Sequence, residues 1–215
     1  MTSKPKNLEV ELRAPITHEG YASFMDFLRT NAEHVGRLNR VLLDYSTFLE
    51  GIGTRKTDVR VRRTNGDTEI IVKKGSFGGS AREEASIFPK DNDLANTLRL
   101  MHMLGYSKAV ACVRSIDRYM CDGIEISIQD ARAFSDPEAV YSRFCEFEIM
   151  CADEAQRSAA VKKIQAFMRE HGLSAFAEDA WNSYVEKLNR EANGIFEYSL
   201  EQVDRLSVLG LPTDR

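Results

Sequence analysis

The sequence lacks the features that mark secreted, membrane-spanning or zinc-binding proteins. Its opening segment, MTSKPKNLEV, has no apolar core of a signal peptide, and no run approaches the roughly 20 apolar residues of a membrane span. Its 4 cysteines form no CxxC pair and have no histidine partner at zinc-ligand spacing. We therefore expect a soluble, cytoplasmic protein with reduced thiols, no membrane partner and no structural zinc.

A strongly basic surface is missing as well. The chain has 29 Lys and Arg residues against 33 Asp and Glu residues, which gives a formal net charge of −4. Such a chain has no global positive field that would attract nucleic acid. We expect no nucleic-acid partner, and any bound anion must be held by bases that the fold brings together locally.

Signatures of nucleophilic catalysis and of a phosphate-binding loop are also absent. The 4 histidines are scattered, and none has a nucleophile partner nearby in the sequence. The glycine-rich segment GSFGGS at residues 75–80 lacks the GK[ST] ending and the following helix of a P-loop. We interpret this segment as a hairpin connection.

What the sequence does contain is a series of alternating polar and apolar segments, which is typical of β-strands. Two of the connections, Asn65-Gly66 and Asp122-Gly123, are strong signals for two-residue hairpin turns. Strands joined mostly by tight turns predict an antiparallel barrel or a large curved sheet. The expected strands are residues 8–14, 41–48, 58–63, 68–74, 81–88, 111–120, 124–130 and 143–151.

Apolar residues at helical spacing predict four helices between and after these strands. Their apolar stripes begin at Tyr21, Leu94, Ala160 and Ala177, and we interpret all four as core. We expect residues 1–190 to form one domain. We expect residues 191–215 to form a helical tail that packs back onto this domain or onto a second copy in a homodimer.

Several strands carry like charges on one face. Side chains two residues apart along a strand point to the same side. Pairs of this kind are Glu9/Glu11, Arg60/Arg62 and Glu146/Glu148. Carboxylate pairs suit Mg²⁺ or Mn²⁺, and arginine pairs can grip phosphate, whereas a surface that serves only solubility would mix both signs. Closing the sheet would bring both sets into one lumen, which predicts a metal–polyphosphate site; the alternative is an open sheet whose charged face lies in water.

Seven segments, in order over residues 8–188, resemble the motifs of the CYTH superfamily, the triphosphate tunnel metalloenzymes, which include class IV adenylate cyclases and thiamine triphosphatases. The segment EVELR at 9–13 resembles the ExExK motif. The others are DY at 44–45, VRVR at 59–62, IVKKG at 71–75, REEAS at 82–86, FCEFE at 144–148 and SYVEKL at 183–188. The resemblance implies an α+β fold, a closed eight-stranded antiparallel β-barrel flanked by helices, and a triphosphate-bearing small molecule as ligand.

The resemblance also implies roles for single residues. The implied ligands of Mg²⁺ or Mn²⁺ are Glu9, Glu11, Glu146 and Glu148. The implied phosphate contacts are Arg13, Arg60, Arg62, Lys73, Arg82 and Arg114, and the implied catalytic set is Glu9, Glu11, Arg13 and Lys73. The neighbouring lysines Lys73 and Lys74 leave the register of the motif's lysine open, and Glu84 is expected to orient the bases or a water molecule.

Three positions depart from the family pattern. Arg13 replaces the lysine of the ExExK motif and keeps its charge, but it cannot lose a proton. Ile116 stands at a basic position and Gln129 at an acidic one. Because Ile116 and Gln129 remove polar groups typical of the cyclase branch, we favour hydrolysis of inorganic, thiamine or nucleoside triphosphate. The alternatives are a class IV adenylate cyclase, which makes cyclic AMP and pyrophosphate, and a non-catalytic polyphosphate- or nucleotide-binding module.

Overall fold

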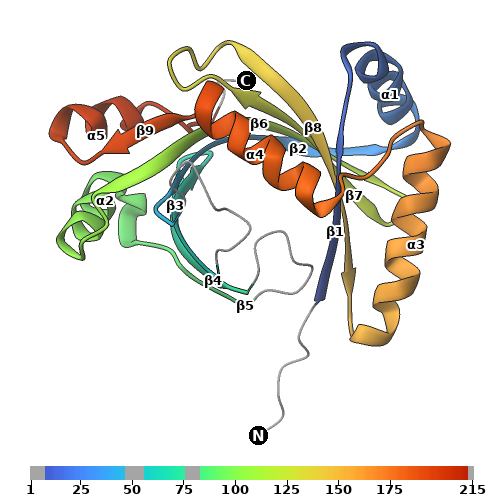
Figure 1. Cartoon of the computed structure of the whole chain (residues 1–215), viewed down its shortest axis with the longest axis horizontal. Coiled ribbons are helices and arrows are strands. Elements are labelled where there is room, and N and C mark those ends of the chain that lie inside the picture. The colour runs from blue at the N-terminus through green and yellow to red at the C-terminus, as the bar shows by residue number, and fades with distance from the viewer. Residues whose placement is uncertain (1–7, 47–55, 76–82, 213–215) are drawn as a thin grey trace, which may run out of the picture. The chain divides into compact units, whose positions relative to one another are not determined.

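The computed structural model describes residues 8–46, 56–75 and 83–212, and it contains helices and strands in a mixed α+β arrangement (Figure 1). The strands are β1 (Leu8–Pro15), β2 (Glu33–Asp44), β3 (Thr57–Thr64), β4 (Asp67–Lys74), β5 (Glu83–Ile87), β6 (Lys108–Cys121), β7 (Ile124–Arg132), β8 (Val140–Cys151) and β9 (Gly194–Glu197). The helices are α1 (His18–Asn31), α2 (Leu94–Met103), α3 (Glu154–Glu170), α4 (Glu178–Glu191) and α5 (Leu200–Ser207), with a 3₁₀ turn, η2, at Lys90–Asn92.

These strands form one nine-stranded sheet in the order β1-β8-β7-β6-β2-β3-β4-β5, with β9 paired to β6. The pairs β1–β8, β2–β3, β3–β4, β4–β5 and β6–β9 are antiparallel. The antiparallel α+β class is thereby confirmed, but the expected number of eight strands is wrong. Closure of the sheet into a barrel stays a prediction.

Two strands differ from the sequence-based expectation. Strand β2 begins at Glu33, eight residues before the expected start at 41, because its first half is exposed or only half-buried and shows no apolar alternation. Strand β9 has four residues, too few for a periodic pattern. The other strands overlap the expected ranges, although residues 81 and 82 of the fifth lie outside the described residues.

Both hairpin turns predicted from the sequence are confirmed. Asn65 and Gly66 have φ angles of 48° and 95°, and Asp122 and Gly123 have φ angles of 49° and 71°. A type I′ turn requires a positive φ at both central residues, which Asn, Asp and Gly tolerate better than other residues. These turns fix the registers on either side of them.

The chain divides into two compact units. Unit 1 comprises Met1–Arg37, Asp117–Gln129 and Arg143–Trp181, and unit 2 comprises Leu38–Ile116, Asp130–Ser142 and Asn182–Arg215. In unit 1, α3 packs along β1 (Figure 1). Their shared core includes Phe24 of α1, Phe147 of β8 and Phe167 of α3, whose rings pack at centroid distances of 6.0–6.5 Å.

Unit 2 has a separate core, in which α2 packs against α5 and against β3 (Figure 1). Both helices have a polar residue that caps the N-terminus. Asp93 accepts a hydrogen bond from the backbone N–H of Asn96 at the start of α2, and Ser199 accepts one from the backbone N–H of Gln202 at the start of α5. All four predicted helices are confirmed, and α5 lies in the region expected to form a helical tail. The domain limits at 190 and 191 stay a prediction.

The four cysteines are free thiols, and all of them are buried. No helix in the described ranges is both long enough and apolar enough to cross a membrane. The expectation of reduced thiols agrees with this arrangement.

Strand β9 depends on a glycine that makes room for an aromatic ring. A Cβ atom at Gly194 would lie 1.9 Å from Cδ1 of Phe134, a buried residue of the unit 2 core. We expect Gly194→Ala to lower the free energy of unfolding by about 2 kcal/mol or more, because the ring has to move out of a packed core. Chemical denaturation would measure this, with Ile195→Val at the exposed next position as control; an unchanged midpoint would contradict the prediction.

Candidate functional site

The glutamates predicted to bind metal lie on one face of unit 1. In the register of β1 and β8, Glu11 is the partner of Glu148, and Arg13 is the partner of Glu146. Directly opposed residues of antiparallel strands share a face of the sheet. Glu9 lies two residues before Glu11 and therefore on the same face, at an exposed position. The neighbouring residues face the other way, into the core of unit 1.

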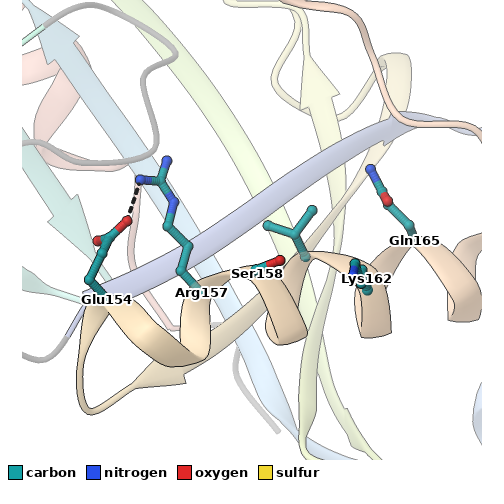
Figure 2. Close-up of a pocket in the computed structure, with 6 residues that line it drawn as sticks. Glu154, Arg157, Ser158, Lys162 and Gln165 are labelled. Carbon is teal, nitrogen blue, oxygen red and sulfur yellow. Dashed lines mark hydrogen bonds and ion pairs between the residues drawn. The ribbon is translucent and has the colours of Figure 1, made fainter.

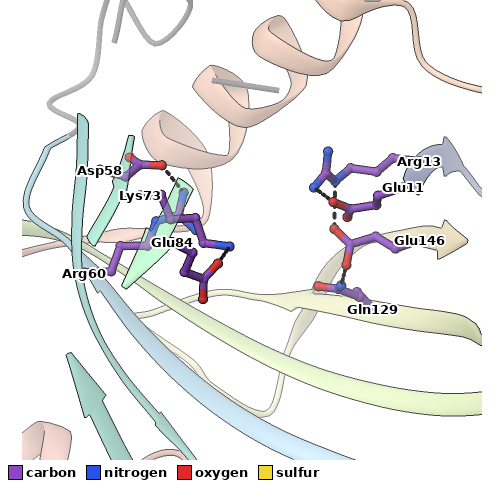
Figure 3. A network of polar contacts seen from close by, with 8 residues as sticks. All are labelled: Glu11, Arg13, Asp58, Arg60, Lys73, Glu84, Gln129 and Glu146. Carbon is purple, nitrogen blue, oxygen red and sulfur yellow. Dashed lines mark hydrogen bonds and ion pairs between the residues drawn. The ribbon is translucent and has the colours of Figure 1, made fainter. Parts of the chain in front are cut away.

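Arg13 contacts two of these glutamates, Glu11 and Glu146 (Figure 3). Its Nη2 lies 2.5 Å from Oε2 of Glu11, and its Nε donates a hydrogen bond of 2.8 Å to Oε1 of Glu146. Gln129 of β7 donates to the other carboxylate oxygen of Glu146. The guanidinium carbon of Arg13 also lies 4.7 Å from the ring centroid of Trp181. The structure thus brings together Glu11, Arg13 and Glu146 as predicted and adds Gln129 and Trp181.

Two carboxyl groups of unit 1, those of Glu11 and Glu148, are shielded from water and lie close to other carboxylates. Burial raises the pKa of Glu11 to about 9, the charge of Glu146 adds to this rise, and Arg13 offsets only part of it. Burial also raises the pKa of Glu148 to about 7, with further contributions from Glu9, Glu125 and Glu146. Arg118 donates two hydrogen bonds of 2.7 and 2.9 Å to Glu125. Its positive charge offsets only part of the rise in the pKa of Glu148. Such a cluster favours the binding of protons or cations.

The raised pKa values predict how stability depends on pH. The pKa of Glu11 rises from 4.5 to about 9 on folding, so the folded protein binds more protons than the unfolded chain between these values. Metal-free protein is therefore most stable at the acidic end of this window and loses stability as the pH rises through it. We expect a loss of at least about 2 kcal/mol between the two ends, since one pKa unit corresponds to ~1.4 kcal/mol. Thermal unfolding in the presence of a chelator would measure it, and Glu11→Gln should remove most of the slope; an equal slope in the variant would contradict the prediction.

The basic residues predicted to bind phosphate lie together on one face of unit 2. In the strand registers, Arg60 is the partner of Asp44, and Arg62 is the partner of Glu69. Lys73 is opposite Asp58 on one side and opposite Glu84 on the other, so all three share the face of the arginines. Lys74 points to the opposite face and is exposed, which selects Lys73 as the lysine of the motif.

Each of these bases already has a carboxylate partner. Arg60 donates from Nη2 to Asp58 at 2.8 Å, and its Nε lies 3.7 Å from Asp44. Nε of Arg62 lies 2.6 Å from Glu69. Asp58 is 0% exposed and Glu69 is 5% exposed, so both acids hold the arginines from within the protein. A guanidinium has five N–H donors and can grip a phosphate while it keeps such a partner.

Lys73 is held in a similar way, with its Nζ 2.5 Å from Oε2 of Glu84 (Figure 3). The expectation that Glu84 orients a base agrees with this contact. Sequence reasoning did not identify Asp58 and Glu69 as partners of the arginines. A signal for Asp58 was present, because it stands two residues before Arg60 and therefore on the same face of β3. Glu69 becomes a partner only through the register of β3 with β4.

Arg114 also belongs to unit 2, on β6. Its Nη1 donates to the backbone oxygen of Val113 at 2.9 Å and lies 3.5 Å from Oδ1 of Asn193. Burial raises the pKa of the thiol of Cys112, and the charges of Arg114 and Arg60 both offset this rise, so the two arginines lie near the same thiol. Ile116, which stands at the family's second basic position, is buried. Arg82 lies outside the described residues.

The donor chemistry of the unit 1 carboxylates fits a hard divalent cation, which prefers oxygen ligands. Burial is the main cause of the raised pKa values of Glu11 and Glu148, and a cation would offset the repulsion between carboxylates that adds to it. Among the residues that the structure describes, however, no group of three or more His, Cys, Asp or Glu side chains is arranged to hold a metal ion. Glu11 and Glu146 instead bond to Arg13 and Gln129.

A hollow of about 400 Å³ lies elsewhere in unit 1 and has a different character (Figure 2). It is lined only by side chains of α3, among them Glu154 and Arg157, which form an ion pair of 2.8 Å. None of the candidate site residues lines it. The hollow is a feature of an exposed helix face and is separate from the candidate site.

No family model and no curated protein matches the sequence significantly. Solved structures match the fold. The protein PH1819 from Pyrococcus horikoshii OT3 is similar with a TM-score of 0.65 and 19% identity, over 85% of this chain and 99% of that one. A candidate adenylate cyclase from Vibrio parahaemolyticus is similar with a TM-score of 0.56 and 17% identity, over 92% of this chain and 97% of that one.

A third similar structure is HpAC1 from Hippeastrum, with a TM-score of 0.53 and 16% identity over 84% of this chain and 95% of that one. It is described as a candidate adenylyl cyclase with a dominant triphosphatase activity. These likenesses show that the chain shares its fold with these structures, which agrees with the resemblance found in the sequence.

Proposed function

We propose that this protein is a metal-dependent hydrolase that cleaves phosphate from inorganic triphosphate, thiamine triphosphate or a nucleoside triphosphate. The observation that carries the proposal is the face of unit 2 on which Arg60, Arg62 and Lys73 lie together, each with a carboxylate partner. Burying a carboxylate such as Asp58 is costly, and a solvated charged surface has no need of it. Bases fixed in this way suit the recognition of a polyphosphate.

The proposed reaction requires Mg²⁺ or Mn²⁺ bound by the glutamates of unit 1. Glu9, Glu11, Glu146 and Glu148 would hold the metal, and the burial of Glu11 and Glu148 beside other carboxylates supports that role. A bound metal of this kind neutralises phosphate oxygens and can activate water. The four glutamates, all from β1 and β8, supply only carboxylate oxygens, which agrees with the preference of both ions.

The chain's own residues would bind and orient the phosphates. Arg60 and Arg62, held by Asp58 and Glu69, offer N–H donors in a fixed geometry that needs little reorganisation when charge develops. Lys73, Arg82 and Arg114 would complete the set of phosphate contacts. Water would then attack the terminal phosphorus, the P–O bond to the neighbouring phosphate would break, and orthophosphate, the shortened substrate and a proton would be released.

A second candidate function is that of a class IV adenylate cyclase, in which a ribose hydroxyl attacks the α-phosphorus of ATP. The description of HpAC1, which joins a cyclase name to a triphosphatase activity, shows that one protein of this fold is associated with both reactions. A third candidate is a binding module without turnover. It is favoured by Ile116 and Gln129, two buried residues at positions where the family pattern has charged ones.

A panel of substrates separates these functions. The full-length protein is incubated with tripolyphosphate, thiamine triphosphate or ATP, with Mg²⁺ or Mn²⁺, and orthophosphate, pyrophosphate and cyclic AMP are measured. Orthophosphate from at least one substrate is the expected result. Pyrophosphate with cyclic AMP would identify the cyclase. Thermal stabilisation by a triphosphate without any product would identify the binding module, and neither stabilisation nor product would contradict all three.

The proposed function also involves the closure of the sheet, the domain limits and the assembly of the protein. We propose that the sheet closes into a barrel whose charged tunnel binds the triphosphate, within a domain of residues 1–190 followed by the tail at 191–215. We propose a cytoplasmic location, a homodimer as the assembly, and neither nucleic acid nor a membrane as partner. Size-exclusion chromatography with light scattering would test the dimer, and a monomer at all concentrations would contradict it.

A further inference from the structure

Two residues that depart from the CYTH pattern, Arg13 and Gln129, contact the same glutamate. Arg13 replaces a lysine, and Gln129 replaces an acidic residue; both donate hydrogen bonds to the same carboxylate, that of Glu146 (Figure 3). A guanidinium can bridge two carboxylates, and Arg13 contacts Glu11 and Glu146 at 2.5 and 2.8 Å. The neutral amide of Gln129 adds a donor without adding negative charge. Together the two departures satisfy Glu146 from within the chain.

The contacts of Arg13 engage oxygens that a metal ion would need. Oε1 of Glu146 accepts from Arg13, Oε2 accepts from Gln129, and Oε2 of Glu11 lies against Arg13. The guanidinium of Arg13 stays charged in a protein. A permanent positive charge at this place opposes a second cation.

The guanidinium of Arg13 is also held against an aromatic ring. Trp181 lies with its ring centroid 4.7 Å from the guanidinium carbon, and its ring packs against those of Phe144 and Phe176 at 5.3 and 5.5 Å. The backbone N–H of Phe176 donates to the backbone oxygen of Arg13 at 2.8 Å. This bond joins the segment before α4 to β1 at the residue whose side chain the ring contacts. The ring is therefore fixed relative to Arg13.

We propose that Arg13 is a tethered counterion that competes with the divalent metal for Glu11 and Glu146, and that Trp181 is the platform that holds its guanidinium. The inference rests on the proposed metal-binding role of these glutamates. It assigns Trp181 as a positioning residue that acts through Arg13. Metal binding requires Arg13 to leave the two carboxylates, so Arg13 sets the metal concentration at which the protein becomes loaded.

The test measures binding of Mg²⁺ alone to the full-length protein, without a triphosphate, by isothermal titration calorimetry. We expect Arg13→Gln to bind Mg²⁺ about tenfold more tightly than the unchanged protein, because the competing charge is gone. Arg157→Gln is the matched control. It removes an arginine from an exposed ion pair with Glu154 in the same unit, away from the glutamates of the candidate site, and should leave the affinity unchanged (Figure 2).

Two further variants keep the test decisive if Arg13→Gln does not fold. Arg13→Lys keeps the positive charge but loses the planar guanidinium that bridges both carboxylates. Trp181→Leu keeps Arg13 but removes the aromatic ring that holds it. Both should bind Mg²⁺ about two- to threefold more tightly. Trp181 is the single tryptophan of the chain, so its fluorescence reports the site. Mg²⁺ should shift its emission in the unchanged protein, and the shift should be absent in Arg13→Gln.

The outcomes separate this inference from the proposed function. Mg²⁺ binding that is equal or weaker in the variants of Arg13 would overturn the inference while leaving the metal site in place. Absence of Mg²⁺ binding in the unchanged protein and in every variant would overturn both. Tighter binding in Arg13→Gln alone, without any effect of Trp181→Leu, would remove Trp181 from the proposal.

Discussion

Changing Glu9 and Glu11 together to glutamine is expected to lower kcat/KM for triphosphate hydrolysis by at least about a thousandfold, or ~4 kcal/mol of transition-state stabilisation. The change removes two of the four proposed metal ligands. It should not unfold the protein, because burial raises the pKa of Glu11 and so favours the neutral form, which glutamine mimics. Steady-state kinetics and circular dichroism of the same preparations would measure both effects.

A matched control for this variant is available on α3. Glu154→Gln removes an exposed carboxylate of the same unit that takes no part in the candidate site. Its turnover should equal that of the unchanged protein. Full activity in the double variant of Glu9 and Glu11 would exclude both glutamates from the reaction, and unfolding of that variant would refute the stated reason for its stability.

Arg60→Lys is expected to raise KM for the triphosphate about thirtyfold, with a smaller effect on kcat. The estimate is ~2 kcal/mol for the loss of a bidentate, charge-assisted contact to phosphate. Lysine is chosen because Asp58, the partner of Arg60, is fully buried, and a neutral substitute would leave its charge uncompensated at a cost of about 3–5 kcal/mol. Initial rates over a range of substrate concentrations would separate KM from kcat.

The control for this prediction is Arg63, which lies on the same strand as Arg60. Arg63 lies on the opposite face of β3 and donates to the backbone oxygens of Gly66 and Ser207. Arg63→Lys should therefore leave KM unchanged. If Arg60→Lys were as neutral as the control, Arg60 would serve only to compensate Asp58, and the basic face of unit 2 would not bind the substrate.

Much of the fold could be predicted because its signals are local. The φ angles at Asn65-Gly66 and Asp122-Gly123 depend on the residue types themselves, so both hairpins follow from the sequence. Strands with one core face, such as β1 and β8, alternate strictly and were found within a few residues. The first half of β2 shows no such alternation because it is largely exposed, and it was missed.

The candidate residues could be grouped by charge, but their partners could not be predicted. Like charges on Arg60 and Arg62 favoured a ligand of opposite sign, yet the structure places Asp58 and Glu69 beside them. Pairing across strands depends on register, and register is a property of the whole sheet. The same reason explains why only the structure distinguishes Lys73 from Lys74.

Trp181 shows a second limit of sequence analysis. Its place in an apolar stripe led to its interpretation as core, and its ring does pack against Phe144 and Phe176. The contact with Arg13 joins two residues of unit 1 that are far apart in the chain. Helical periodicity indicates that a side chain is shielded from water, but it carries no information on which distant side chain shields it.

The most direct test of the account is a crystal structure with Mn²⁺ and a non-hydrolysable triphosphate, using the anomalous scattering of manganese to locate the metal. The account predicts a manganese peak ligated by Glu11 and Glu146, with Arg13 displaced from both, and phosphate oxygens against Arg60. A triphosphate bound elsewhere on the protein, or manganese bound without any of these glutamates, would contradict it.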